Sequence, residues 1–291
     1  MKTFLGRVMK PDQIDRIIRR VDKLPTLPII YTKLTRLLQA PNTTVQMIGN
    51  IIAEDQAIAV KVLRLVNSAF YALPHKIGSL KHAIVLLGMS QVRNLVLATS
   101  TLKMFKEYKS AQSFDMQKFW EHSVGCAVAA KVLAETAHLP SPDDIFSGGL
   151  LHDIGKLIHA IYLDEAFNAV IADVQEREVP MFESEKKIFG YDHTYTGKEL
   201  AARWSLSQGT IEMIAHHHLT DTSVRLTKEI AAIHIANTIC IALGLGSGGE
   251  KKIPVANTKA WEILGIDVGN LEYILARIEK LFKESTSILE S

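Results

Sequence analysis

A histidine and an aspartate stand side by side at His152 and Asp153, in an apolar run that also contains Gly148, Gly149 and Gly155. A neutral imidazole nitrogen and a carboxylate oxygen can bind one cation together, so the pair suits a metal site. The glycines are costly in a helix and indicate that another helix or an ion approaches the backbone closely. A buried histidine satisfied by its neighbouring carboxylate is the simpler alternative, and the dipeptide alone favours it.

More histidines lie in the same half of the chain, each inside or beside an apolar helical pattern. They are His122, His193 and the triplet formed by residues 216–218. Taken singly, each of them is more often a core residue than a ligand. Their concentration in one region favours a shared metal site. Nitrogen and oxygen donors of this kind are compatible with iron, manganese or zinc.

The elements that must position these residues are helices, because nearly every segment shows the helical period and no convincing strand is present. His122 lies on the apolar face of a long helix predicted over residues 115–136, one turn before Cys126. Ser141 reads as the N-cap of a helix, with Asp144 closing a capping box, so His152-Asp153 is expected in the C-terminal half of that helix.

The remaining patterns set the domain organisation. The polar stretch 106–113 marks a soft boundary between helical units at residues 1–110 and 111–291. A short charged helix is predicted over residues 12–21 and an apolar core helix over residues 228–243. The Gly/Ser/Lys-rich segment 244–252 is expected to be a mobile loop.

Composition excludes several classes of protein. The 291 residues are 47% hydrophobic and 22% charged, which is ample for a large core. A net charge of +2 with scattered basic residues argues against nucleic-acid binding. Cys126 and Cys240 lie far apart in apolar surroundings, which favours a reducing cytoplasm, and the N-terminus has no apolar signal region. The apolar segment 230–245 is too short for a membrane span.

The order of the histidines resembles the HD superfamily of metal-dependent phosphohydrolases, which includes the two-metal HD-GYP cyclic-dinucleotide phosphodiesterases. The ligands that the resemblance implies are, in chain order, His122, His152, Asp153, His193, His217 and His218. The register of the paired histidines within residues 216–218 is open by one residue.

The first half of the chain resembles one branch of that superfamily, the HDOD domain, which is the HD-related output domain of bacterial signalling proteins. Residues 24–28, 52–55, 63–68 and 79–88 carry this resemblance, although Gln56 stands where the family usually has proline. The resemblance covers about residues 20–240, with a helical extension at residues 254–287. It implies an all-α architecture in which an N-terminal helical subdomain packs on an HD-like helical bundle. Asn67, in the third segment, also reads as a simple helix-end cap.

Three positions depart from the hydrolase pattern. Asn237 stands where the last ligating aspartate is expected, and its neutral amide removes one negative charge although its oxygen can still coordinate. Lys118 stands where some two-metal relatives have a glutamate. The Gly-Tyr-Pro signature after the paired histidines is absent from residues 219–222.

The resemblance therefore implies a regulatory or output module of bacterial signal transduction, with an HD-type metal site and little or no hydrolase activity. A fuller ligand set than many relatives keep leaves open a metal-dependent phosphohydrolase acting on a nucleotide or cyclic dinucleotide. Asp153 and Lys156 are then the catalytic candidates, with Lys156 contacting phosphate, although Lys156 also reads as a solvated lysine near a helix end. A ligand-sensing pocket with a structural metal is a third alternative. The expected partner is a signalling protein or a small ligand, not a nucleic acid or a membrane.

Overall fold

The computed structural model describes residues 29–67, 71, 73–107, 114–219, 221 and 223–290. Every regular element in these ranges is a helix, which confirms the predicted all-α fold. The helix predicted over residues 12–21 lies outside the described residues. No helix among the described residues is long and apolar enough to cross a membrane.

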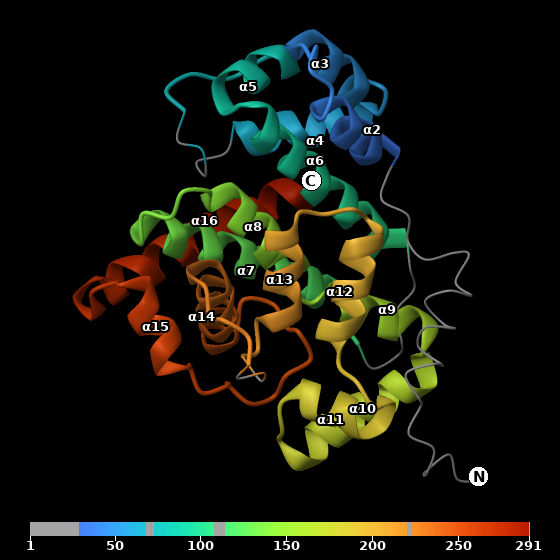
Figure 1. Cartoon of the computed structure of the whole chain (residues 1–291), viewed down its shortest axis with the longest axis vertical. Coiled ribbons are helices and arrows are strands. Elements are labelled where there is room, and N and C mark those ends of the chain that lie inside the picture. Colours follow the sequence, from blue (N-terminus) through green and yellow to red (C-terminus); the bar gives the residue numbers. More distant parts are fainter. Residues whose placement is uncertain are drawn as a thin grey trace.

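The N-terminal helices form one layer at the top of Figure 1. They are α2 (Ile29–Leu38), α3 (Val45–Ala53), α4 (Gln56–Val66), α5 (Leu80–Leu87) and α6 (Met89–Glu107). Side chains cap the first turn of three of them: Thr44 accepts one free N–H group of α3, Asp55 accepts two of α4, and Ser79 accepts one of α5. The Asn67 side chain caps the end of α4 by donating to the Leu63 carbonyl. Its amide also donates to the Ile77 carbonyl and accepts from the Ile77 N–H, so its role in the described structure is structural.

The second layer carries the histidines. Its helices are α7 (Met116–Thr136), α8 (Pro142–Leu151), α9 (Ile154–Tyr162), α10 (Asp164–Arg177), α11 (Met181–Phe189), α12 (His193–Arg203), α13 (Gln208–His216), α14 (Lys228–Leu243), α15 (Thr258–Leu264), the short 3₁₀ helix η1 (Val268–Asn270) and α16 (Leu271–Glu290). Helix α7 is buried on nearly all sides and packs against α8, α14 and α16. It is therefore the central element of this layer (Figure 1).

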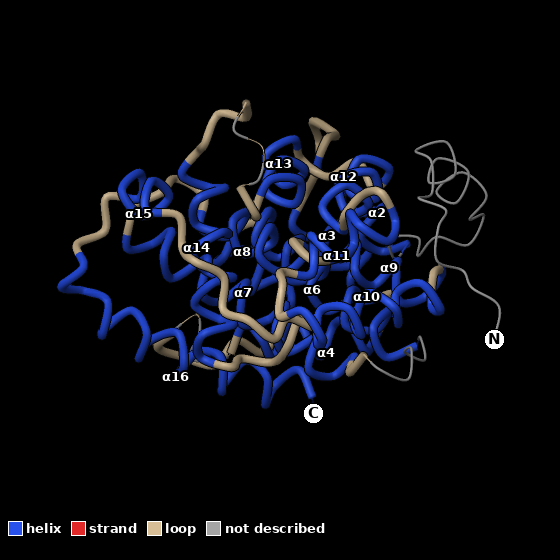
Figure 2. The backbone as a smooth tube through the Cα atoms, turned by 90° about the horizontal axis from the view of Figure 1, so that it is seen from below, coloured by secondary structure: helices blue, strands red, loops and turns tan. Residues whose placement is uncertain are grey.

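Two helices, α6 and α16, join the two layers. Helix α6 contacts α7 and α8, and the C-terminal helix α16 contacts both α7 and α4. Figure 2 shows α16 running along the edge of the bundle toward α4. The C-terminal extension thus packs on both layers.

Two glycines allow the close helix approach that the sequence indicates. A Cβ atom at Gly149 would lie 2.7 Å from the carbonyl oxygen of Cys126 on α7. One at Gly155 would lie 2.0 Å from the carbonyl oxygen of His193 on α12. Because these neighbours are backbone atoms, they cannot move aside as a flexible side chain does. Because Gly149 and Gly155 have no side chain, α7 and α12 can pack directly against the segment that contains His152 and Asp153.

We expect Gly155→Ala to lower the free energy of unfolding by at least ~1–3 kcal/mol, because the methyl group overpacks against the backbone of α12. Urea denaturation measures the change. Gly209→Ala is the matched control, since a Cβ there meets nothing within 4 Å and alanine suits a helix better than glycine. Equal stability of the two variants would contradict the close packing of α9 on α12.

Candidate metal centre

His152 and Asp153 occupy a break between two helices, and the prediction that they lie within one helix is wrong. Helix α8 ends at Leu151 and α9 begins at Ile154. The Ser141 side chain makes no capping bond, so the predicted capping box is also absent. Consecutive residues of a continuous helix point about 100° apart. At the break (Asp153 φ −99°, ψ 10°) the two side chains lie together, with His152 Nε2 3.3 Å from Asp153 Oδ2.

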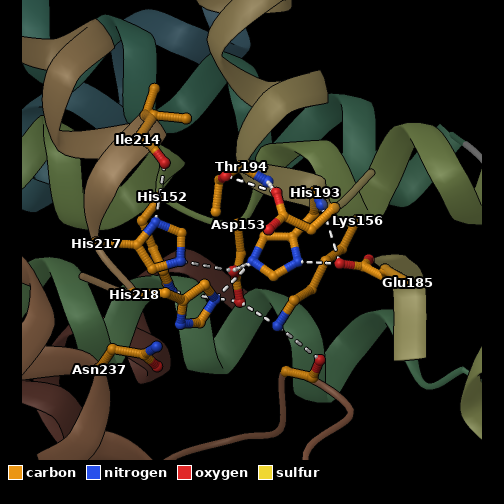
Figure 3. Close-up of polar contacts among 12 residues, drawn as sticks. His152, Asp153, Lys156, Glu185, His193, Thr194, Ile214, His217, His218 and Asn237 are labelled. Carbon is orange, nitrogen blue, oxygen red and sulfur yellow. Dashed lines mark hydrogen bonds and ion pairs between the residues drawn. The ribbon is translucent and has the colours of Figure 1, made fainter. Parts of the chain in front are cut away.

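Asp153 lies at the middle of the histidine cluster, with one oxygen toward each side (Figure 3). Its Oδ2 atom is 3.3 Å from His152 Nε2 and 3.7 Å from His122 Nε2. Its Oδ1 atom is 3.1 Å from His193 Nε2 and 3.5 Å from His217 Nε2. One carboxylate thus faces two sets of imidazole nitrogens.

The ligand atoms form two groups, in each of which they lie within 4.8 Å of one another. The first ligand group is His122, Cys126 and His152. The second ligand group is Asp153, His193, His217 and His218. In the second group the Nε2 atoms of His193 and His218 are 2.9 Å apart, so a proton or a cation must lie between them.

Backbone carbonyls orient two of the histidines. The Nδ1 atom of His152 donates to the Gly149 carbonyl at 2.7 Å, and that of His217 donates to the Ile214 carbonyl at 2.9 Å. Each bond holds the hydrogen on Nδ1 and leaves Nε2 with a free lone pair directed at Asp153. This is the usual arrangement of a metal-binding imidazole.

Several atoms at the centre have no hydrogen-bond partner although they are buried. They include Nε2 of His152, Nε2 of His217 and Oδ1 of Asp153. The other oxygen of Asp153, Oδ2, lies 2.8 Å from Lys156 Nζ. Buried polar atoms in folded proteins are nearly always partnered, and a divalent ion would satisfy this set. The donors present therefore fit a metal centre.

The protonation states suit the same role. Burial lowers the pKa of His122 to about 3 and that of His217 to about 4, so both imidazoles are neutral at neutral pH. Burial alone would raise the pKa of Asp153, but His152 and Lys156 outweigh it and hold that pKa well below its usual value. His122 and His217 thus offer neutral nitrogens beside a charged carboxylate.

Glu185 on α11 is a buried carboxylate that the sequence analysis missed. It accepts from His193 Nδ1 at 2.5 Å and from the His193 backbone N–H at 2.9 Å. Its other oxygen contacts His159 Nδ1 at 3.0 Å, and His159 is held in turn by Thr196 at 2.8 Å. Burial would lower the pKa of His193, but Glu185 outweighs it and raises the pKa to about 10. A cation at Nε2 must therefore displace a proton.

We expect Glu185→Gln to raise the dissociation constant for a divalent metal by ~10–100-fold, because His193 loses the carboxylate that orients it. Titration against a chromogenic chelator measures the affinity. Glu183→Gln on the exposed side of the same helix is the matched control. The same affinity in both variants would mean that His193 does not ligate the ion.

Lys156 is buried, and the alternative that it is a solvated lysine is wrong. Its Nζ atom lies 2.8 Å from Asp153 Oδ2, 2.5 Å from Glu250 Oε1 and 3.1 Å from the Gly248 carbonyl. Burial would lower the pKa of Lys156, but the Asp153 and Glu250 carboxylates raise it above its usual value. The ammonium group is thus held between two carboxylates.

Residues 244–250, which we call the strap, lie against this centre. Their composition predicts a mobile loop, yet Ser247 N–H donates to the Lys118 carbonyl at 2.8 Å and Gly248 is buried. A Cβ atom at Gly246 would lie 2.2 Å from the backbone nitrogen of His122, and one at Gly248 would lie 3.2 Å from Asp153 Oδ2. The glycines that suggested mobility instead permit close contact. Figure 2 shows the long connection from α14 to α15 crossing the lower face of the bundle.

Three further positions named in the sequence analysis lie beside the two ligand groups or outside them. His216 points away and pairs with Glu212 at 3.2 Å, so His217 and His218 are the two members of the triplet that face the centre. Asn237 lies beside the first ligand group, with Oδ1 3.9 Å from Cys126 Sγ. The side chain of Lys118 is exposed and joins neither group.

Comparison with known proteins gives a consistent result. A family model described as the HDOD domain matches residues 24–220. The crystal structure of an HDOD domain protein with unknown function from Geobacter sulfurreducens has a TM-score of 0.77 and 26% identity, covering 95% of this chain and 96% of that one. The structure of a candidate phosphohydrolase from Shewanella amazonensis SB2B has a TM-score of 0.72 and 25% identity, covering 94% and 97%. An uncharacterized protein of Treponema pallidum (strain Nichols) is 24% identical over 203 residues, which are 69% of this chain and only 39% of that protein.

Proposed function

The chain belongs to the HDOD family, and on that premise we propose that it is a regulatory output module of bacterial signalling. In the second half of the proposal, its buried His-Asp centre holds divalent metal but has no efficient phosphohydrolase activity. One observation carries the second half of this proposal. An ammonium group has three N–H donors, and three acceptors of this chain surround Lys156 Nζ. The lysine that would contact a substrate phosphate is therefore fully engaged by Asp153, Glu250 and Gly248.

The residues that would hold metal are the two ligand groups, with Asp153 contributing one oxygen to each. A bound divalent ion supplies Lewis acidity, which polarises a phosphoryl oxygen and makes a bound water more acidic. The chain's own residues set the conditions: Glu185 orients His193, and the strap keeps bulk water from Lys156. In the absence of a ligand that displaces the strap, the centre is closed to a phosphate ester.

A metal-dependent phosphohydrolase acting on a nucleotide or cyclic dinucleotide is the second candidate. The completeness of the two ligand groups favours it, as does similarity to the Shewanella amazonensis protein described as a candidate phosphohydrolase. The strap and Asn237 favour the regulatory module instead. The two functions differ in turnover, not in metal content.

The test is hydrolysis of a generic phosphodiester by tag-free, full-length protein loaded with zinc or manganese. We expect no turnover above that of the free metal ion. Turnover that is abolished by His152→Ala, and unaffected by His216→Ala, would establish the enzyme and overturn the proposed module.

We expect Asn237→Asp to tighten metal binding by roughly tenfold or more, because the substitution adds a negative charge beside His122. Groups just outside a metal's ligands typically change metal affinity by ~10–100-fold, which sets this magnitude. Chelator competition measures it. Asn168→Asp on α10, away from the centre, is the matched control. An affinity unchanged by Asn237→Asp would place residue 237 outside the metal centre.

A further inference from the structure

Cys126 is a member of the first ligand group that neither the family resemblance nor the comparisons assign. It is fully buried on α7, one turn after His122, so the two side chains share one face of the helix. Its Sγ atom lies 3.6 Å from His122 Nε2. The spacing was visible in the sequence, but the cysteine read there as a core residue.

The distances around Cys126 match the edges of a metal coordination shell. With metal–sulfur bonds of ~2.3 Å and metal–nitrogen bonds of ~2.0–2.1 Å, a tetrahedral arrangement has sulfur–nitrogen edges of about 3.5 Å and nitrogen–oxygen edges of about 3.4 Å. The sulfur–nitrogen edge from Cys126 to His122 is 3.6 Å. The nitrogen–oxygen edges to Asp153 Oδ2 are 3.3 Å from His152 and 3.7 Å from His122. These three edges agree with a tetrahedral shell, and the ligand atoms of His122, Cys126 and His152 all lie within 4.8 Å of one another.

The charge at this position also points to the thiol. Asn237 stands where the hydrolase pattern has a carboxylate, and its Oδ1 atom lies 3.9 Å from Cys126 Sγ. Asp153 is then the sole anionic side chain in direct contact with the imidazoles of the first ligand group among the described residues. A thiolate at Cys126 would supply the negative charge that Asn237 lacks.

Resting on the proposed metal centre, we propose that Cys126 is a metal ligand, so that the first site is formed by two histidines, Asp153 and a cysteine thiolate. As the ion binds, the sulfur–hydrogen bond breaks, the sulfur–metal bond forms and the proton leaves to the buffer. A thiolate favours zinc and similar borderline-soft ions over manganese or magnesium. The site is accordingly a zinc-class site.

The competing explanation is that the Cys126 thiol only makes hydrogen bonds, with His122, Asn237 and the neighbouring thiol of Cys240. Burial raises the pKa of the Cys126 thiol, so in the metal-free protein these hydrogen bonds are the expected state. That explanation leaves His152 Nε2 buried without a hydrogen-bond partner, 3.3 Å from Asp153 Oδ2. An ion held by Cys126, His122, His152 and Asp153 Oδ2 would satisfy that nitrogen.

Cobalt(II) titration of the tag-free, full-length protein tests the inference. We expect a thiolate-to-cobalt charge-transfer band in the near ultraviolet, lost in Cys126→Ala and in Cys126→Ser. Cys240→Ala, which removes the other buried cysteine, is the matched control and should retain the band. Zinc affinity should fall by more than ~100-fold in Cys126→Ala, beyond the ~10–100-fold typical of residues outside the ligand shell.

The outcomes separate this inference from the proposed function. Visible cobalt absorption without the ultraviolet band, or a band that survives Cys126→Ala, overturns the cysteine ligand and leaves the metal centre standing. Absence of any cobalt absorption overturns both. X-ray absorption of the zinc-loaded wild type needs no variant: a sulfur neighbour at ~2.3 Å supports the inference, and a shell of nitrogen and oxygen alone overturns it.

Discussion

Asp153→Asn should reduce metal affinity by more than ~100-fold at both ligand groups at once. The reason is that one carboxylate directs Oδ2 to the first group and Oδ1 to the second. Asparagine keeps the shape but loses the charge, and its amide nitrogen cannot ligate. The expected loss exceeds the ~10–100-fold effect of residues that only orient ligands. Isothermal titration with zinc measures it.

Asp164→Asn, on the exposed start of α10, is the matched control for this substitution and should bind metal like the wild type. Asp153→Asn must remain helical by circular dichroism for the comparison to count. Tight binding of even one ion by Asp153→Asn would show that the carboxylate does not bridge the two groups.

Lys156→Met should lower the free energy of unfolding of the metal-free protein by ~3–5 kcal/mol. The substitution leaves the buried carboxylates of Asp153 and Glu250 facing each other without their shared cation, and breaking a buried ion pair from one side has this cost. Urea denaturation measures it. Lys186→Met is the control, because its ion pair with Asp192 is half exposed on the lysine side and contributes at most ~1 kcal/mol.

The double variant Lys156→Met/Glu250→Gln tests whether the unpaired carboxylates cause the loss of stability. Neutralising Glu250 removes one of the two unpaired charges, so the double variant should be more stable than Lys156→Met alone. A loss below ~1 kcal/mol for Lys156→Met would contradict the buried network between the strap and Asp153.

Much of the fold is readable from the sequence because the helix signals are local. Helix α14 is predicted over residues 228–243, which are its bounds in the structure, since Thr227 caps its start and Gly244 adopts the left-handed conformation that ends it. The break at Asp153 is different. Neither a proline nor a glycine occupies the junction itself, so the break follows from tertiary packing, which no local pattern reports.

The metal-ligand candidates could be predicted because histidines in apolar helices are conspicuous. In the structure the predicted histidine ligands all lie around Asp153, and Asn237 lies at the edge of the centre. The residues that support them were not readable. Glu250 is 94 positions from Lys156, and Glu185 reads as one more charge on an amphipathic helix. Only long-range folding shows that these carboxylates are buried against the centre.

Metal content of the protein, purified without a histidine tag, tests the central claim most directly. Mass spectrometry of wild type and Asp153→Asn, each dialysed and reloaded with zinc, gives the number of ions per chain. We predict at least one tightly held ion per chain in the wild type and none in the variant. A wild type that retains no metal, or a variant that retains as much as the wild type, would contradict a metal centre organised around Asp153.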